Sequence, residues 1–478
     1  MKSPLARNLS ETAHIPIDRG MCAQQNHFLI FISEFIMSLI RSLTAGTSSL
    51  KAHQQRLDVI SNNIANTNTI GYKSSRTTFA DQFAQTYSLG SAPNNIASGG
   101  IGGIDPLQIG LGVKLGSVKV DFSQGSIQNT NRPLDLALQG DGFFNLRLNG
   151  QELFSRAGAF SFDNQGNLVD SASGAYVQGY NLETDTTGRV IKDAIGTNSL
   201  LRKVENVQIS PTFKSAPRQS QAVEISGNLS ATTSTGDSFS TSISIFDNQG
   251  APHLLNLKFT KSATANTFDL AGTVDAVATP IPGIPASITF NPDGTLSTPL
   301  NFNITAADMN ATLGTPSFDA TTPKDLTVTL AQSSGLLAGL TQFAGQNTVT
   351  ARQQDGYAAG EISRISVDQT GKIMGAFTNG QSELLGQVVM SKFTNPGGLV
   401  KEGGNFFSVS PNSGLPSIGT AVEIFPSTRI SSGSLEESNV DLTEQFTDMI
   451  TTQRAFEAAS RTITVSDQFL QEINQLKR

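Results

Sequence analysis

The chain has 478 residues, of which 37% are hydrophobic and 15% are charged, and its net charge at pH 7 is −7. This length allows roughly three domains. The low apolar content argues against one large core, and the negative charge argues against general binding to nucleic acid or anionic membranes. The single cysteine, Cys22, excludes an intrachain disulfide and cysteine-rich zinc sites.

Residues 1–36 differ in character from the rest of the chain. The run HFLIFISEFI at 27–36 is apolar but short, and Glu34 interrupts it. A signal peptide needs a basic stretch before its apolar run and a small-residue cleavage site after it, and neither is clear here. We expect an extension that is disordered or that reflects a mis-called start, with Met37 as the functional start. The alternative is a genuine export or regulatory leader.

From Met37 onward, apolar residues recur every seven positions, which predicts an amphipathic helix over 37–66 with a coiled-coil-like stripe. A second stripe with the same spacing predicts another helix over 440–478, a segment that contains no glycine or proline. Asp441 and Glu444 have the spacing of a capping box at its start. The stripe residues are Leu43, Leu50, Leu57, Ile60 and Ile64 in the first helix, and Leu442, Met449, Phe456, Ile463 and Leu470 in the second.

The two helices lie at opposite ends of the chain, so the simplest arrangement pairs them antiparallel in one end domain, 37–66 plus 440–478. A unit of two helices has too small a core to be stable alone. We therefore expect it to gain order by packing against copies of itself.

The middle of the chain, about 105–435, is predicted to be β-structure. Apolar and polar residues alternate in 113–122, 241–250 and 360–377. A signature of an apolar residue, Asp or Asn, two further residues and a glycine predicts hairpin turns, because the Asx side chain bonds to the turn backbone and glycine adopts positive φ. This signature occurs at 162–166, 246–250, 290–294 and 367–371.

The predicted fold class is therefore α+β and multidomain, with nested mainly-β domains between the paired terminal helices. A polar, glycine-rich stretch at 67–105 is expected to be an extended joining segment. Residues 106–180 plus 346–439 form the expected discontinuous inner β-domain. Residues 181–345, rich in Ser, Thr, Ala and Pro, form the expected inserted outer β-domain.

The common motifs of catalytic and cofactor sites are missing from the sequence. We find no phosphate-binding GxxxxGK[ST] loop, no strand–GxGxxG–helix context and no HExxH. Substrate-stacking aromatics are also few, with no Trp and five Tyr. We therefore predict no catalytic, cofactor-binding or metal-binding residues, and a protein that is not an enzyme.

Three stretches resemble the bacterial flagellar rod and hook protein family. Residues 37–76 match its N-terminal hallmark, a heptad helix that ends in S-N-N-I-A-N-x-x-T-x-G-[YF]-K. Residues 134–180 resemble its central block around GDGFF, and 432–478 resemble its C-terminal helix, which is preceded by L-E-x-S-N-V-D. The matched central motif is Gly140, Asp141, Gly142, Phe143 and Phe144. With weaker matches between them, these stretches cover nearly all of 37–478.

The resemblance, together with a length that allows a large inserted domain, implies a structural subunit of the flagellar hook. The hook is a curved, bendable tube that transmits torque from the motor and rod to the filament. The implied partners are further copies of the chain in a helical homopolymer, the distal rod protein, the hook cap, the hook–filament junction protein and the flagellar export apparatus.

The resemblance further implies an extracellular location in the flagellum after type III export, without nucleic-acid binding or membrane insertion. A distal rod or hook-associated junction protein is the alternative within the family. A secreted β-rich adhesin is the alternative outside it.

Within this family context, the asparagine cluster in SNNIANTNTIGYK at 61–73 is interpreted as an assembly joint between the helix and the β-body. Asparagine is unfavourable inside helices because its amide competes for backbone hydrogen bonds. We expect these amides and hydroxyls to satisfy backbone groups of neighbouring subunits, with Gly71 supplying a turn. The predicted joint residues are Asn62, Asn63, Asn66, Thr69, Gly71 and Tyr72.

Overall fold

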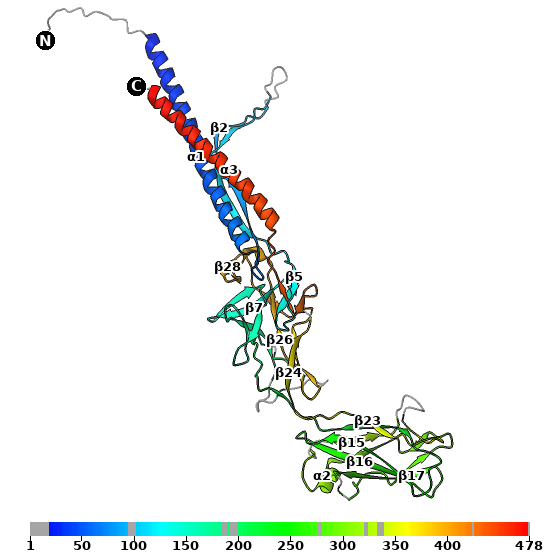
Figure 1. Ribbon diagram of the computed structural model, residues 1–478. Coiled ribbons are helices and arrows are strands. Elements are labelled where there is room, and N and C mark those ends of the chain that lie inside the picture. The colour runs from blue at the N-terminus through cyan, green and yellow to red at the C-terminus, as the bar shows by residue number, and fades with distance from the viewer. Residues whose placement is uncertain are drawn as a thin grey trace, which may run out of the picture. The chain divides into compact units, whose positions relative to one another are not determined.

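The chain divides into two compact units in the computed structural model (Figure 1). The first comprises residues 1–129, 393–416 and 435–478, and the second comprises 130–392 and 417–434. The structure describes residues 19–93, 102–183, 190, 199–201, 203–275, 277, 279–319, 324–331, 339–422 and 425–476, with 19–36, 474 and 476 described by their backbone alone.

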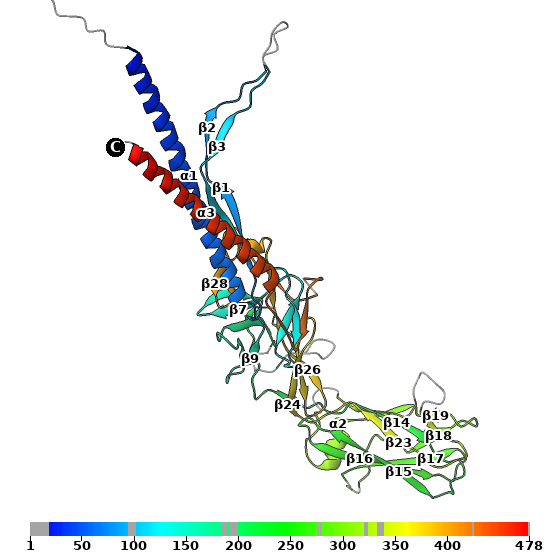
Figure 2. The same ribbon diagram turned by 45° about the horizontal axis from the view of Figure 1, so that its top comes forward.

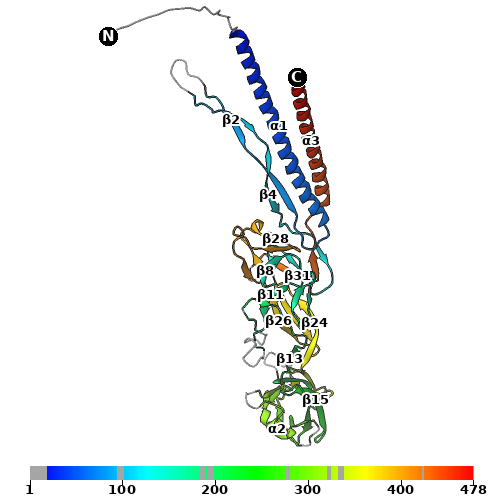
Figure 3. The same cartoon turned by 90° about the vertical axis from the view of Figure 1, so that its left-hand side faces the viewer.

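Two long helices dominate the first unit. Helix α1 (Arg19–Ala65) and helix α3 (Leu442–Leu476) lie side by side and run in opposite directions, as Figures 1, 2 and 3 show. The predicted antiparallel pairing of the terminal helices is therefore confirmed. Asp441 caps α3 as predicted, because its Oδ1 accepts the backbone N–H groups of Thr443 at 2.8 Å and Glu444 at 3.3 Å.

Helix α1 begins well before Met37, so the expectation of disorder is wrong for residues 19–36. The stretch 21–45 contains no glycine or proline, and nothing in it interrupts the ladder of backbone hydrogen bonds. Residues 1–18 lie outside the described part of the chain.

The segment 67–105 contains paired strands where we expected a plain joining segment. Strand β1 (Ser75–Asp81) pairs antiparallel with β4 (Val113–Val120), and β2 (Ala84–Ser88) pairs with β3 (Leu107–Gly110) (Figure 2). This pairing places β3 and β4 in the first unit, although we expected the inner β-domain to begin at 106. The other elements of this unit are β5 (Ile127–Asn129), η1 (Pro396–Gly398), β28 (Val400–Gly403), β29 (Phe406–Ser408) and most of β32 (Ser434–Glu436).

A large sheet forms one part of the second unit, and its strands run in the order β13-β24-β25-β26-β11-β7-β8. Strands β12 and β13 pair antiparallel with β11 and β24, so the chain from 205 to 215 belongs to this sheet and not to the inserted domain. The strands of this sheet in the second unit are β7 (Phe143–Leu148), β8 (Gln151–Ser155), β9 (Phe160–Phe162), β10 (Leu168–Asp170), β11 (Tyr176–Asn181), β12 (Glu205–Asn206), β13 (Lys214–Ser215), β24 (Gly360–Val367), β25 (Lys372–Phe377), β26 (Ser382–Val388), β27 (Met390–Lys392) and β30 (Ser417–Gly419). Strands β6 (Leu136–Gln139) and β31 (Arg429–Ser432) pair with each other in a separate two-stranded sheet.

All four predicted turn signatures connect antiparallel strands. They join β9 to β10, β15 to β16, β18 to β19 and β24 to β25. In three of them the Asx carboxylate accepts backbone N–H groups of the turn, as in Asp247, whose Oδ1 accepts from Gln249 at 2.9 Å and Ala251 at 2.8 Å. The local turn chemistry therefore sets these connections.

The inserted domain has a hydrophobic core of its own, and the members of that core lie between Val223 and Val349. Its two five-stranded sheets have the orders β15-β16-β17-β18-β19 and β20-β21-β14-β22 with β23 on β14. The elements are β14 (Ala222–Asn228), β15 (Ser238–Phe246), β16 (Pro252–Lys261), β17 (Thr267–Val274), β18 (Ser287–Phe290), β19 (Leu296–Thr298), β20 (Asn301–Ile304), α2 (Ala306–Leu313), β21 (Leu326–Thr329), β22 (Leu340–Thr341) and β23 (Thr350–Gln354).

The two ends of the inserted domain are tied together. Arg218 and Tyr357 exchange backbone hydrogen bonds of 3.0 Å in both directions. Asp355 accepts the N–H groups of Gln221 and Ala222 at 2.8 and 2.9 Å. The domain therefore begins near residue 218, later than the expected boundary at 181.

An excised fragment of residues 216–358 is expected to fold on its own, because it carries this core and both closing contacts. Phe259→Ala should lower its free energy of unfolding by about 3–5 kcal/mol, since the ring is fully buried. Lys258→Ala, at the adjacent exposed position of β16, should change it by less than about 0.5 kcal/mol. Urea unfolding followed by circular dichroism measures both. A fragment without a cooperative transition would contradict an independent core.

Candidate assembly interface

Small and polar side chains line the contact between α1 and α3. Four buried residues of α3 follow one another at intervals of seven: Gln445, Thr452, Ala459 and Ser466. On α1, Gly46 faces Ile463 so closely that a Cβ added to it would lie 3.0 Å from Cγ1 of that side chain. Nearby, the hydroxyl oxygens of Ser42 and Ser466 are 3.4 Å apart. Small residues at this seam allow the two backbones to approach closely.

Most residues of the predicted apolar stripes lie beside the row of buried α3 residues, although Ile463 packs against Gly46 and Ile60 is buried. The seven-residue period was correct, but on α3 the buried row is offset by three positions from the predicted one. The reason is that a count of apolar residues overlooks the small residues that let helices approach. Ile60 is buried and Leu442 is exposed, whereas the half-buried stripe residues are Leu43, Leu50, Leu57, Ile64, Met449, Phe456, Ile463 and Leu470.

Large apolar side chains of α3 face solvent on either side of the seam. We define the proximal patch as Leu442, Phe446 and Ile450, whose side chains are 41%, 50% and 58% exposed. The distal patch is Val465 and Phe469, both 47% exposed. Members of each patch are four residues apart and therefore neighbours on the helix surface.

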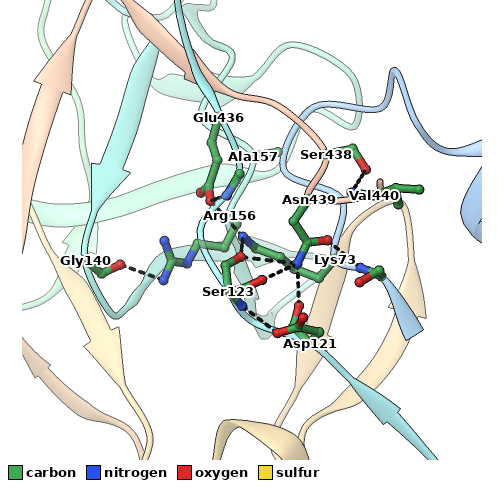
Figure 4. Close-up of polar contacts among 12 residues, drawn as sticks. Lys73, Asp121, Ser123, Gly140, Arg156, Ala157, Glu436, Ser438, Asn439 and Val440 are labelled. Carbon is green, nitrogen blue, oxygen red and sulfur yellow. Dashed lines mark hydrogen bonds and ion pairs between the residues drawn. The ribbon is translucent and has the colours of Figure 1, made fainter. Parts of the chain in front are cut away.

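A buried ion pair joins the segment after α1 to the segment before α3 (Figure 4). Nζ of Lys73 lies 2.7 Å from Oε1 of Glu436, and neither side chain has any solvent exposure. The same ammonium donates to the carbonyl of Ser123 at 2.7 Å, and Glu436 accepts the N–H of Gly125 at 2.9 Å. Both charges are thus compensated inside the protein, as burial requires.

Asn63 connects the end of α1 to the start of α3. Its amide nitrogen donates to the Ser75 carbonyl at 2.8 Å and to Oε1 of Gln445 at 3.0 Å. Its oxygen accepts the Ser75 N–H at 3.0 Å and the Tyr72 hydroxyl at 3.2 Å. One buried amide of α1 therefore satisfies four groups from two other segments of the chain, 71–75 and the start of α3.

Asn439 makes an equivalent connection just before α3 (Figure 4). Its Oδ1 accepts the N–H of Ser74 at 2.8 Å, and its Nδ2 donates to the carbonyl of Asp121 at 2.9 Å and to Oγ of Ser123 at 3.0 Å. The segments 71–75, 121–126 and 436–439 therefore form one network, which we call the joint.

Lys401 covers the outer side of the joint. Its ammonium lies 4.8 Å from the centre of the Tyr72 ring and donates to the Lys73 carbonyl and to Oγ of Ser75, both at 3.0 Å. Burial lowers the pKa of Lys401 and raises the pKa of the Tyr72 hydroxyl, because each loses solvation of its charged form.

The predicted joint residues bond within their own chain. Asn66 donates to the Asn62 carbonyl at 2.9 Å and accepts from the Thr69 hydroxyl at 3.1 Å. Gly71 has φ of +68°, and its N–H donates to the backbone carbonyl of Glu436 at 2.8 Å. The turn expected at Gly71 is confirmed. The polar groups of Asn63, which we expected to serve neighbouring subunits, have intrachain partners.

Sequence reasoning missed Lys73, Glu436 and Asn439 as joint residues. All three stand in the motifs on which the family resemblance rests, and two carry opposite charges close to the ends of the two predicted helices. That placement was the available signal.

The central motif GDGFF lies in the second unit and builds its core. Phe143 and Phe144 are buried in β7, and the Phe144 ring makes an edge contact with Phe160 at a centroid distance of 5.1 Å. The Gly140 carbonyl accepts from the Arg156 guanidinium at 2.7 Å, and Asp141 forms an ion pair with Lys392 at 3.1 Å. This motif therefore has a packing role within its unit.

The described residues include neither a metal-binding cluster nor a membrane-spanning helix. No group of three or more His, Cys, Asp or Glu side chains there could hold a metal ion. No helix in that part of the chain is long and apolar enough to cross a membrane.

Relatives of known identity match the chain along most of its length. The flagellar hook protein FlgE of Treponema pallidum (strain Nichols) is 33% identical over 470 residues, covering 92% of this chain and 100% of the relative. FlgE of Borreliella burgdorferi is 34% identical over 462 residues, with 92% and 100% covered. The chain belongs to the flagellar hook protein FlgE family. Members of this family are structural subunits of the flagellar hook, and the family contains no known enzyme.

Family models divide the FlgE-family chain into four matched regions. They are the flagella basal body rod protein (43–73), the flagellar hook protein FlgE/F/G D1 domain (137–231), the flagellar basal body protein FlaE D2 domain (219–357) and the flagellar basal body rod FlgEFG protein C-terminal region (431–476). Among solved structures, the Helicobacter pylori flagellar hook protein FlgE2 is similar at a TM-score of 0.42 and 16% identity, covering 65% of this chain and 100% of that one.

Gly46→Leu should separate α1 from α3, because even a Cβ at this position sits against Ile463 and a larger side chain has no space. We expect a loss of about 1–3 kcal/mol in the free energy of unfolding of the first unit, and a smaller helical circular dichroism signal. Gln54→Leu, an exposed position on the same helix, serves as control. Equal stability of the two variants would contradict a close seam at Gly46.

Proposed function

We propose that this chain polymerises into the curved, bendable tube of the flagellar hook, and that α1 and α3 together form its assembly element. The supporting observation is the pair of exposed apolar patches on α3, on a helix whose other face is already packed on α1. Phenylalanine and isoleucine at these positions would leave water when another subunit packs on them. Burying each side chain fully contributes roughly 1.5–3 kcal/mol.

The contacts between subunits are proposed to be head-to-tail. In such a contact one surface of a subunit binds a different surface of the next, so the assembly remains open and grows as a helical polymer. Apolar contacts between tightly packed helices would resist twisting, which a tube that transmits torque requires.

The inserted β-domain is proposed to tolerate bending of the tube. Its core is separate, and its exposed β15 and β16 positions carry hydroxyl and amide side chains such as Ser240, Ser242 and Asn256. Polar surfaces of this kind can slide against similar surfaces with small changes in free energy, whereas interdigitated apolar surfaces cannot.

The proposed partners are the distal rod protein, the hook cap, the hook–filament junction protein and the flagellar export apparatus. The proposed location is the extracellular part of the flagellum, reached by type III export. A chain without an intrachain disulfide suits export in an unfolded form. Each partner follows from the proposed place of the chain between rod and filament.

Electron microscopy of the purified protein would distinguish a hook from a rod, because a hook subunit gives curved tubes and a rod subunit straight ones.

Ile450→Asp should block polymerisation and leave the soluble chain folded, because the side chain is exposed and its charge would be buried only between subunits. Thr451→Asp adds the same charge at the next exposed position, on a different face of α3, and is the control. Sedimentation and electron microscopy measure assembly, and circular dichroism measures folding. Normal tubes from Ile450→Asp would refute a role for the proximal patch.

A further inference from the structure

We propose that the buried Lys73–Glu436 ion pair sets the register of α1 on α3, so that these two residues position the assembly element without contacting another subunit. The inference rests on the proposed function only in taking the helix pair as the assembly element. In this proposal, the Lys73–Glu436 pair determines the position of α1 along the axis of α3.

The seam between the helices is poorly suited to this task. Its buried α3 residues are small or polar and recur every seven residues, and Gly46 and Ser42 oppose them from α1. If α3 slides along α1 by seven residues, the small residues of the buried row face α1 again, so that row by itself distinguishes registers weakly. The contact of Ile463 with Gly46 and the partly exposed Arg56–Asp448 ion pair, at 3.0 Å, also depend on register. Large interlocking apolar side chains penalise a wrong register strongly, but among the described side chains α3 contributes none that is buried, and on α1 only Leu39 and Ile60 are buried.

In the joint, in contrast, only one arrangement of the three segments gives the buried charges of Lys73 and Glu436 their partners. The Lys73 ammonium needs both Glu436 and the Ser123 carbonyl, and Glu436 also accepts from Gly125. The backbone bond from Gly71 to Glu436 holds the same two segments together at 2.8 Å. Displacing one segment by a residue would leave two fully buried charges without their partners, which is among the most costly defects in a protein.

Short connections carry this constraint to the helices. Helix α1 ends at Ala65, before Lys73, and α3 begins at Leu442, after Glu436. Asn63, in the last turn of α1, bonds to Ser75 of the joint. Asn439, in the connection to α3, bonds to Ser74 (Figure 4). A fixed ion pair therefore leaves the helices little freedom to slide.

Engineered cysteines can report the register directly. In a Cys22→Ser background, Ser42→Cys with Ser466→Cys reports the observed register, because the two hydroxyl oxygens are 3.4 Å apart. Ser42→Cys with Thr462→Cys reports a displacement by one helical turn. The ratio of the two disulfide yields after mild oxidation is the measured quantity, both for the soluble chain and for assembled material.

The test compares two joint variants with a surface control. Glu436→Gln removes one charge, and Lys73→Met with Glu436→Leu replaces the pair by apolar side chains of similar size. Glu457→Gln breaks the exposed pair with Arg454 on α3. We expect the ratio of observed to displaced cross-link to fall by more than about tenfold in both joint variants, and to stay unchanged in the control.

An unchanged ratio in the folded double variant would overturn the proposal, because the seam alone would then hold the register. Loss of both cross-links together with the helical circular dichroism signal would also overturn it, since the pair would then be a general stabiliser. The soluble-chain measurement does not depend on polymerisation. A chain that fails to assemble but shows the expected ratios would refute the proposed function and leave this inference standing.

Discussion

The buried ion pair between Lys73 and Glu436 is the strictest physical constraint in the first unit, because both side chains are fully removed from solvent. Removing two charges from water costs several kcal/mol for each, and this cost is recovered only when the charges meet with good geometry and further hydrogen bonds. The protein meets this condition by bringing together segments that are 363 residues apart in sequence. The carbonyl of Ser123 and the N–H of Gly125 complete the arrangement. The two chain ends are therefore joined by polar chemistry more than by a shared hydrophobic core.

This arrangement explains how the apolar residues of the terminal helices are distributed. Because the joint brings α1 and α3 together, the seam between them can consist of small residues such as Gly46 and Ala459. The large apolar side chains, among them Phe446 and Ile450, are then left on the outside of the pair. A subunit that kept them in its own core would have less apolar surface to offer to other copies. The terminal helices thus contact each other modestly through their small residues. In our proposal, they contact other chains strongly through their large apolar residues.

The β-structure, unlike the helix pair, is determined largely by local turns and by contacts within each domain. Its hairpins are set locally by Asx and glycine turns, and the inserted domain closes on itself through Arg218, Tyr357 and Asp355. A domain with its own core and joined ends can be inserted into another fold without disturbing it. The central GDGFF motif stabilises the second unit through the buried rings of Phe143 and Phe144.

The sequence by itself determined the elements that depend on local chemistry: the two terminal helices and their heptad period, the Asp441 cap and the four hairpin turns. The family resemblance, carried by motifs at both chain ends, was also readable there. Only the tertiary structure decided which side of each helix is buried, because small residues such as Gly46 and Thr452 form a close contact that hydrophobicity does not reveal. It alone showed that strands β12 and β13 belong to the larger sheet, and that Lys73 meets Glu436. Pairings across hundreds of residues depend on the whole fold, and the sequence shows only opposite charges near the ends of the two predicted helices, which does not by itself identify partners.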